Sequence, residues 1–347
     1  MTPTLWIENI GCLLRMTRGN GGPARGTAMS QVDAIPDGLL IARGERIVYA
    51  GPRAHVPPGL APGTGTEVVD AGGALVTPGL VDPHTHPVFA KSRSEEWAMR
   101  VAGKSYEEIA AAVGGIRNSA RALRSTPEAT LLHNARKIAD RMLAAGTTTM
   151  EAKSGYGLSL ESELAQLRVI AELNRTHPID FVPTFLGAHE VPDEYRSDRA
   201  AYIRLIIDEM IPAVVGSHLA EYCDVFCESH VFTSEETREI LEAGLRHGLR
   251  AKIHADELHA SGGSLIAGEL HASSADHLVH VDAQGIAALK SGDVVAVLLP
   301  ATTFFLGSDR YARARNLIEA GVPVAIATDC NPGSSMVESM PLTLSIA

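Results

Sequence analysis

Two histidines separated by one residue, His84 and His86, follow an apolar stretch of the chain. Side chains two residues apart in extended backbone point to the same side, so both imidazoles can bind one metal ion. On its own the pair is equally consistent with an exposed turn, because a motif this short has low specificity. The prediction of a metal centre therefore depends on further ligands elsewhere in the sequence.

Those further ligands stand at the ends of apolar, strand-like runs later in the chain. His254 and Asp329 end two such runs. Three imidazoles and one carboxylate suit Zn²⁺ or a similar divalent ion and leave one position open for water. The ion lowers the pKa of that water towards about 7. A neighbouring group must then move protons, and Glu257 and His277 are the candidates.

Each of these residues also has a purely structural interpretation. A single buried histidine such as His254 is more often a satisfied core residue than a ligand. Asp329 could cap a helix, and His277 could be structural. The occurrence of all these side chains at four different strand ends favours the metal site.

The elements that must position these residues begin near Ala74. From there, eight strand-like runs alternate with helical runs over about 260 residues. This alternation predicts an α/β fold with a parallel sheet, and eight units predict a closed (β/α)₈ barrel whose active site lies at the C-terminal strand ends. An open doubly wound sheet is the alternative, but no glycine-rich dinucleotide-binding motif follows any strand.

Several boundaries follow from capping signals and periodicity. A helix is expected to start near Pro127, capped by Thr126, and to end at Gly146. Thr233 and Glu236 form the pattern of a capping box. Residues 105–113 and 308–321 are expected to be helical, and residues 295–302 to form a strand.

Residues 1–73 predict a separate, small β-sandwich-type domain. Residues 39–51 have the pattern of a hairpin, and the glycine-rich residues 17–30 are expected to form a mobile loop. The barrel is expected over residues 74–347. Its last stretch, residues 335–347, is typical of the start of a closing helix, so we expect a chain truncated at the C-terminus.

Composition limits the class of protein. The net charge is −11, from 30 basic and 41 acidic residues, which argues against nucleic acid or an anionic membrane as the partner. The four cysteines are few and irregularly spaced, which indicates a reducing compartment. There is no signal-peptide pattern and no apolar run long enough to span a bilayer. A cytoplasmic protein that acts on a small molecule is expected.

The motifs of the barrel resemble those of the amidohydrolase superfamily and, within it, the imidazolonepropionase family. The resemblance covers nearly the whole chain. The segment Pro83–Pro87 marks only the superfamily. Three motifs are more specific: KSGYGL at 153–158, FLGAH at 185–189 and TDCNPGSS at 328–335.

The resemblance implies hydrolysis of the ring C–N bond of 4-imidazolone-5-propanoate to N-formimidoyl-L-glutamate, a step of histidine degradation, by a metal-activated water. It implies a homodimer with one Zn²⁺ or iron ion per subunit, held by His84, His86, His254 and Asp329. Glu257 would be the base and proton shuttle, assisted by His277. The substrate would be bound by Arg93, Tyr156, His189, Glu257, Asn331, Gly333 and Ser334, with help from Tyr106.

Two other functions stay open at this point. One is another cyclic amidohydrolase, or an aminohydrolase (deaminase) of the same superfamily, with the same metal and a different ring. The other is an inactive, truncated metal-binding fragment. Arg93 favours a substrate with a carboxylate, because a guanidinium can bind that group with two hydrogen bonds.

Overall fold

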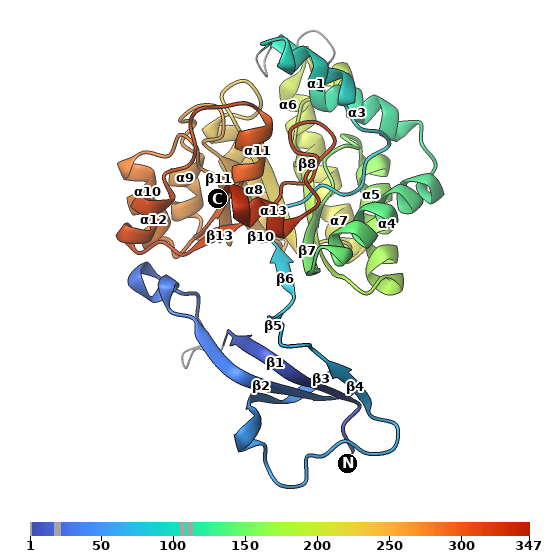
Figure 1. Ribbon diagram of the computed structural model, residues 1–347. Coiled ribbons are helices and arrows are strands. Elements are labelled where there is room, and N and C mark those ends of the chain that lie inside the picture. Colours follow the sequence, from blue (N-terminus) through green and yellow to red (C-terminus); the bar gives the residue numbers. More distant parts are fainter. Residues whose placement is uncertain (1, 17–21, 105–107, 110–113) are drawn as a thin grey trace. The chain divides into compact units, whose positions relative to one another are not determined.

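The computed structural model describes residues 2–16, 22–104, 108–109 and 114–347. The chain divides into two compact units, Met1–Gly79 and Leu80–Ala347 (Figure 1). Tyr106, most of the expected helix at 105–113, and residues 17–21 of the expected mobile loop lie outside the described residues. The end of that loop forms a short 3₁₀ helix, η1 (Gly26–Ser30).

The first unit is one five-stranded sheet with its own small core. Strand β1 (Leu5–Arg15) pairs antiparallel with β2 (Asp33–Arg43), which pairs with β3 (Arg46–Pro52). Strands β4 (Glu67–Asp70) and β5 (Leu75–Val76) run parallel to β1, and η2 (Arg53–His55) follows β3. The β2–β3 hairpin confirms the hairpin predicted at 39–51. The first unit has two clusters of buried apolar residues. One consists of Trp6, Leu39 and Ile41, and the other of Ile10, Leu13 and Ile35.

The second unit contains eight parallel strands in the order of the sequence (Figure 1). Each predicted strand-like run from Ala74 onward contains one of them, so the (β/α)₈ prediction is confirmed. The strands are β6 (Leu80–Asp82), β7 (Thr147–Lys153), β8 (Asp180–Ala188), β9 (Tyr222–Cys227), β10 (Arg250–Ala255), β11 (Ser274–His277), β12 (Val295–Leu298) and β13 (Val324–Ile326).

The first and last strands of this sheet meet through the segments that follow them. Thr85 and Cys330 form an isolated parallel bridge. The Asp82 carboxylate accepts hydrogen bonds from the Thr328 amide (3.1 Å) and from its hydroxyl (2.6 Å). These same segments carry three of the predicted metal ligands. The closure of the barrel and the assembly of the site therefore depend on the same contacts.

Helices alternate with the strands, as predicted. They are α1 (Ser94–Val101), α3 (Gly115–Arg124), α4 (Glu128–Ala144), α5 (Leu160–Thr176), α6 (Arg199–Arg204), α7 (Ile211–Gly216), α8 (Ser234–Arg246), α9 (Gly263–Glu269), α10 (Ala283–Ser291), α11 (Pro300–Phe305), α12 (Ala314–Ala320) and α13 (Met340–Ile346), with a 3₁₀ turn η3 (Asp193–Tyr195) and a π turn η4 (Leu205–Met210). The apolar stripe of α4 is buried, as its helical spacing requires.

Two capping predictions have different outcomes. The capping box of α8 is confirmed, since the Thr233 hydroxyl accepts from the Glu236 amide and the Glu236 carboxylate accepts from the Thr233 amide. The prediction that Thr126 caps α4 is wrong. Its hydroxyl donates to the Ala122 carbonyl (2.8 Å) at the end of α3 instead, and α4 begins without a side-chain cap. Gly146, with φ 95°, follows the end of α4 as predicted.

Two predicted element lengths also need correction. The strand expected at 295–302 ends at Leu298, and Pro300 opens α11, a position where its missing N–H costs no helical hydrogen bond. Only Ala314–Ala320 of the helix expected at 308–321 is helical. The alternative role of Asp329 as a helix cap is excluded for α13, which Ser339 caps through the Leu342 amide.

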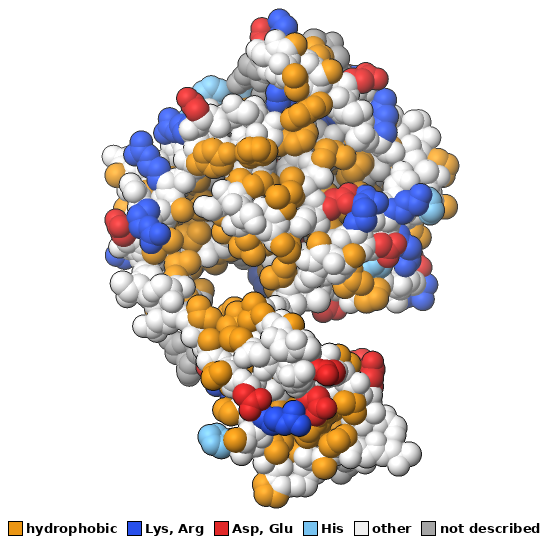
Figure 2. Space-filling model, in the orientation of Figure 1, with side chains coloured by type: hydrophobic (Ala, Val, Ile, Leu, Met, Phe, Trp, Pro, Cys, Tyr) orange, Lys and Arg blue, Asp and Glu red, His pale blue; other side chains and the backbone are white. Residues whose placement is uncertain are grey.

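No helix in the described part of the chain is both long and apolar enough to cross a bilayer. On the face shown in Figure 2, Lys and Arg side chains are interspersed with Asp and Glu.

Candidate functional site

The predicted metal ligands meet at the C-terminal ends of the barrel strands. His84 and His86 follow β6, and Asp329 follows β13; all three are buried. Nε2 of His84 and Nε2 of His86 are 3.3 Å apart. They lie 3.5 Å and 3.6 Å from Oδ1 of Asp329. Three potential ligand atoms from the two ends of the sheet thus converge on one point.

His254, at the end of β10, belongs to the same cluster. Its ring centroid is 4.5 Å from that of His84 and 5.5 Å from that of His86. The ligand atoms of His84, His254 and His277 all lie within 4.8 Å of one another. Nε2 of His254 is buried and has no hydrogen-bond partner among the described residues. A divalent metal ion would satisfy this orphaned nitrogen, so the donor set fits such an ion.

Burial sets the charge state of these groups. It lowers the pKa of His84, His86 and His277 well below the usual range, and raises the pKa of Asp329 to about 6. The three imidazoles are therefore neutral at pH 7, which is the form that binds metals.

Two carboxylates and one hydroxyl contact three of the candidate ligands. His84 Nδ1 lies 2.6 Å from Asp276 Oδ2, and His254 Nδ1 lies 3.1 Å from Asp224 Oδ1. The Thr302 hydroxyl donates to Asp329 Oδ2 (2.7 Å). Asp224, Asp276 and Thr302 are not among the predicted site residues. A carboxylate inside the otherwise apolar run of β9 is the sequence signal that could have revealed Asp224.

Asp224 and Asp276 belong to a group that we call the buried charge layer. It consists of charged side chains from β7 and from the three adjacent strands β9, β10 and β11, each less than one tenth exposed: Glu151, Lys153, Asp224, Lys252 and Asp276. Burial lowers the pKa of Lys153, but the charges of Asp224 and Glu151 raise it more, and the net shift is upward. The Lys153 ammonium therefore stays charged inside the barrel.

Glu257 and His277 lie together beside the ligand cluster. Oε2 of Glu257 is 3.5 Å from Nε2 of His277. Burial, followed by the charge of Asp329, raises the pKa of Glu257 well above its usual range. A buried carboxyl with a raised pKa, next to an imidazole, is a candidate general acid–base.

Two residues of the candidate site have a strained backbone conformation. His277 and Asp329 have φ of 75° and 52°, a left-handed conformation that residues other than glycine seldom adopt. Such conformations cost about 1–3 kcal/mol each and persist where surrounding contacts impose them, typically at functional sites.

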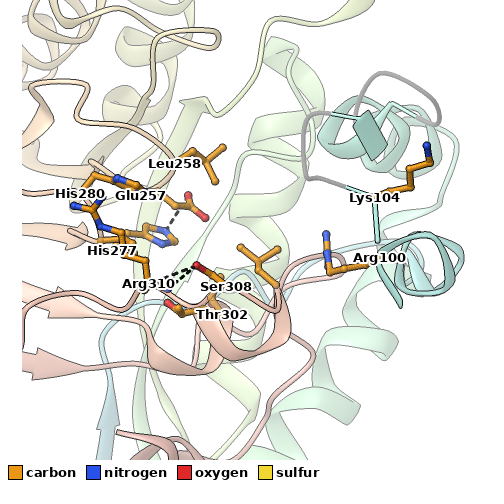
Figure 3. Close-up of a pocket in the computed structure, with 12 residues that line it drawn as sticks. Arg100, Lys104, Glu257, Leu258, His277, His280, Thr302, Ser308 and Arg310 are labelled. Atoms are coloured by element: carbon orange, nitrogen blue, oxygen red, sulfur yellow. Dashed lines mark hydrogen bonds and ion pairs between the residues drawn. The ribbon is translucent and has the colours of Figure 1, made fainter. Parts of the chain in front are cut away.

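A cavity of about 240 Å³ opens beside this pair (Figure 3). Glu257 and His277 line it together with three basic side chains, Arg100, Lys104 and Arg310. The space next to the candidate acid–base pair is thus electropositive, which suits an anionic ligand.

Arg93 lies at the start of α1 and is 6% exposed. Its Nε donates to Glu96 Oε2 (3.1 Å) and its Nη1 to the Ser119 hydroxyl (3.0 Å). A Cβ atom at Gly333 would lie only 1.8 Å from Nη2 of Arg93. The glycine therefore leaves the space that the guanidinium occupies, which gives Gly333 a steric role beside Arg93.

Tyr156 and His189 follow β7 and β8 and face the ligands. The His189 ring stacks on that of His86 with centroids 5.1 Å apart, and the Tyr156 ring is 5.2 Å from that of His189. Nδ1 of His189 lies 2.9 Å from the Gly155 carbonyl. The Glu163 carboxylate accepts from three amides of the loop that carries Tyr156, so this loop is held in a fixed conformation.

Asn331 shapes the loop after β13. Its Oδ1 accepts from the amides of Gly333 (2.8 Å) and Ser334 (2.7 Å), and its Nδ2 donates to the Asp329 carbonyl (2.8 Å). These contacts fix the backbone between a candidate ligand and the glycine beside Arg93. We call the loop-borne candidates the loop rim: Arg93, Tyr156, His189, Asn331 and Ser334.

Most of the predicted site residues line one small cavity. Its lining consists of His86, Arg93, Ile116, Tyr156, His189, Phe226, His254, Glu257, His277, Asp329, Asn331 and Ser334. Two predicted site residues, His84 and Gly333, do not line it. Ile116 and Phe226 are lining residues that were not predicted, since apolar residues carry no chemical signal in a sequence.

Comparison with known proteins agrees with the geometry. Residues 75–346 match the model of the amidohydrolase family. A protein of Solibacter usitatus named imidazolonepropionase is 50% identical over 329 residues, which are 95% of this chain and 78% of the relative. A protein of Geobacillus kaustophilus with the same name is 47% identical over 344 residues, 99% of this chain and 81% of the relative.

Solved structures show the same fold at low identity. Guanine deaminase from C. acetobutylicum matches with a TM-score of 0.70 and 13% identity, over 99% of this chain and 78% of its own. The 5-methylcytosine deaminase from Klebsiella pneumoniae matches with a TM-score of 0.69 and 15% identity, over 98% and 79%. These matches support the barrel fold alone.

Proposed function

Because the chain belongs to the amidohydrolase family, we propose that it is an imidazolonepropionase: it hydrolyses the ring C–N bond of 4-imidazolone-5-propanoate to N-formimidoyl-L-glutamate in histidine degradation. The observation that carries the proposal is the convergence of His84, His86, His254 and Asp329 beside Glu257, with buried Arg93 lining the same cavity. Relatives of that name at 43–50% identity support it.

His84, His86, His254 and Asp329 would hold one Zn²⁺ or iron ion. A bound ion supplies a Lewis acid that polarises the ring carbonyl and lowers the pKa of the attacking water. The neutral imidazoles and the orphaned Nε2 of His254 fit this role.

Glu257 moves the proton in the proposed reaction. Water attacks the ring carbonyl carbon and gives its proton to the Glu257 carboxylate, which passes it to the ring nitrogen as the C–N bond breaks. The carbonyl carbon becomes the new carboxylate of the product. His277, 3.5 Å from Glu257, donates a hydrogen bond to the oxyanion that develops at the carbonyl oxygen.

The loop rim orients the substrate. The Arg93 guanidinium binds the propanoate carboxylate, and its own contacts with Glu96 and Ser119 hold it in place for this. Tyr156 and His189 pack against the imidazolone ring. A fixed rim lowers the entropy cost of bringing the ring to the catalytic groups.

The experiment is to load the purified protein with Zn²⁺ or Fe²⁺ and add 4-imidazolone-5-propanoate. We expect the ring absorbance to disappear and N-formimidoyl-L-glutamate to form in equal amount. Release of ammonia without ring opening would assign a deaminase reaction instead. A metal-loaded, folded protein that leaves the substrate unchanged would contradict the proposal. Size-exclusion chromatography tests the accompanying proposal of a homodimer.

A further inference from the structure

The buried charge layer touches two of the candidate metal ligands directly. Asp276 Oδ2 lies 2.6 Å from His84 Nδ1, and Asp224 Oδ1 lies 3.1 Å from His254 Nδ1. A carboxylate in this position accepts a hydrogen bond, so each Nδ1 carries the proton and each Nε2 presents a lone pair. The carboxylates thereby select the tautomer that can bind a metal.

Lys153 contacts the same two carboxylates. Its Nζ lies 2.6 Å from Asp224 Oδ2, 2.8 Å from Glu151 Oε1 and 3.8 Å from Asp276 Oδ2. Nδ1 of His254 lies 3.1 Å from both oxygens of Asp224, and one of these oxygens, Oδ2, also binds Lys153. One carboxylate thus joins the Lys153 ammonium to the His254 ring.

Lys252 makes a second connection, which includes the backbone next to a ligand. Its Nζ lies 3.5 Å from Asp276 Oδ2, 3.3 Å from Glu151 Oε2 and 3.2 Å from the Pro83 carbonyl. Pro83 directly precedes His84 in the chain. Lys252 thus contacts both the backbone beside His84 and the carboxylate that orients its ring.

The register of the strands places these groups at the same level along the barrel. His254 pairs with Asp276 across β10 and β11, and Lys252 pairs with Asp224 across β10 and β9. Because adjacent strands set the spacing, the layer is more rigid than a set of loops would be. Three carboxylates and two ammonium groups also compensate one another inside the barrel, as buried charges require.

We propose that Asp224 and Asp276 are positioning residues for the metal centre, which fix the ring orientation of His254 and His84, and that Lys153 acts through Asp224. This rests on the proposed metal centre but not on the identity of the substrate. Metal affinity is therefore the property to measure, and it remains informative whatever ring the enzyme hydrolyses.

The test measures Zn²⁺ affinity by competition with a chromogenic chelator, and the absorption spectrum of the Co²⁺-loaded protein. We expect Asp224→Ala and Asp276→Ala to weaken Zn²⁺ binding by about 10- to 100-fold and to change the Co²⁺ spectrum. Asp224→Asn keeps an acceptor for Nδ1 and should recover part of the affinity, with a remaining loss of about 3- to 10-fold.

Lys153→Met tests the second half of the proposal. It should weaken Zn²⁺ binding by about 10-fold in the wild type and cause no additional loss in the Asp224→Ala background, because contacts that act as a unit are not additive. Equal losses in both backgrounds would show that Lys153 does not act through Asp224.

A matched control separates positioning from general destabilisation. Ile240→Ala, in the buried face of α8, should lower the melting temperature yet leave Zn²⁺ affinity and the Co²⁺ spectrum unchanged. If Asp224→Ala stays folded and binds Zn²⁺ within about twofold of the wild type, with an unchanged spectrum, the proposal is overturned. Should that variant not fold, the same result for the nearly isosteric Asp224→Asn overturns it.

Discussion

The buried charge layer and the loop rim border the same candidate metal site, but different contacts hold their side chains. The layer comes from the barrel strands β7, β9, β10 and β11, and its charges pair with one another and with two imidazoles. The rim comes from loops and the start of α1, and local hydrogen bonds hold it, such as those of Asn331. The difference predicts that the strand-borne charges of the layer position the metal ligands and that the loop-borne groups of the rim control substrate binding.

The largest effect should come from a strand-borne ligand. His254→Ala removes one imidazole, and we expect metal content to fall and kcat/KM to drop by about 1,000-fold or more, since metal catalysis contributes several kcal/mol. Metal analysis and ring-absorbance assays measure the two changes. Full metal content and full activity of this variant would contradict the role of His254 as a metal ligand.

The next effect concerns Asp82, which joins the two ends of the sheet. Burial raises its pKa to about 7, against hydrogen bonds from Thr328 that lower it. Since the folded state holds this proton more tightly than the unfolded state, the stabilisation is present at low pH and is lost as pH rises from about 4 through 7. Relative to Asp82→Asn, the wild type should therefore lose up to about 4 kcal/mol of unfolding free energy over this range.

Urea unfolding of the metal-free proteins between pH 4.5 and 8 measures this difference. Asp309→Asn, at an exposed position, is the matched control and should leave the pH dependence unchanged. Parallel stability curves for the wild type and Asp82→Asn would contradict the expectation.

Glu257 lies two residues after the end of β10. It belongs to neither the buried charge layer nor the loop rim. Glu257→Gln cannot accept the proton of the attacking water, so kcat should fall by about 100- to 1,000-fold. Metal content should change little, because the side chain is not among the proposed ligands. A fall in metal content would show that Glu257 also contributes to metal binding.

The smallest effect should come from the rim, and two variants test it together. Arg93→Gln loses a charge-assisted contact to the substrate carboxylate and should raise KM by about 10- to 100-fold without loss of metal. Gly333→Ala should give a similar change in KM, because its methyl group would displace the flexible end of Arg93. If Gly333→Ala left KM unchanged, the steric link between these residues would be wrong.

Much of the barrel could be predicted from local patterns. Strand-like runs and helical spacing predicted eight βα units, and the capping box of Thr233 and Glu236 fixed the start of α8. Local patterns failed where neighbours outside the segment decide the outcome. Thr126 bonds back to α3 instead of capping α4, and the run at 295–302 divides into β12 and α11 at Pro300.

The sequence by itself determined which side chains could do chemistry and that they stand at strand ends, because residue type and strand periodicity are local properties. The tertiary structure alone decided their partners. Asp224 behind His254, Thr302 on Asp329 and Gly333 beside Arg93 each join segments tens or hundreds of residues apart. Such contacts depend on strand register and barrel closure, which arise only when the whole sheet is assembled.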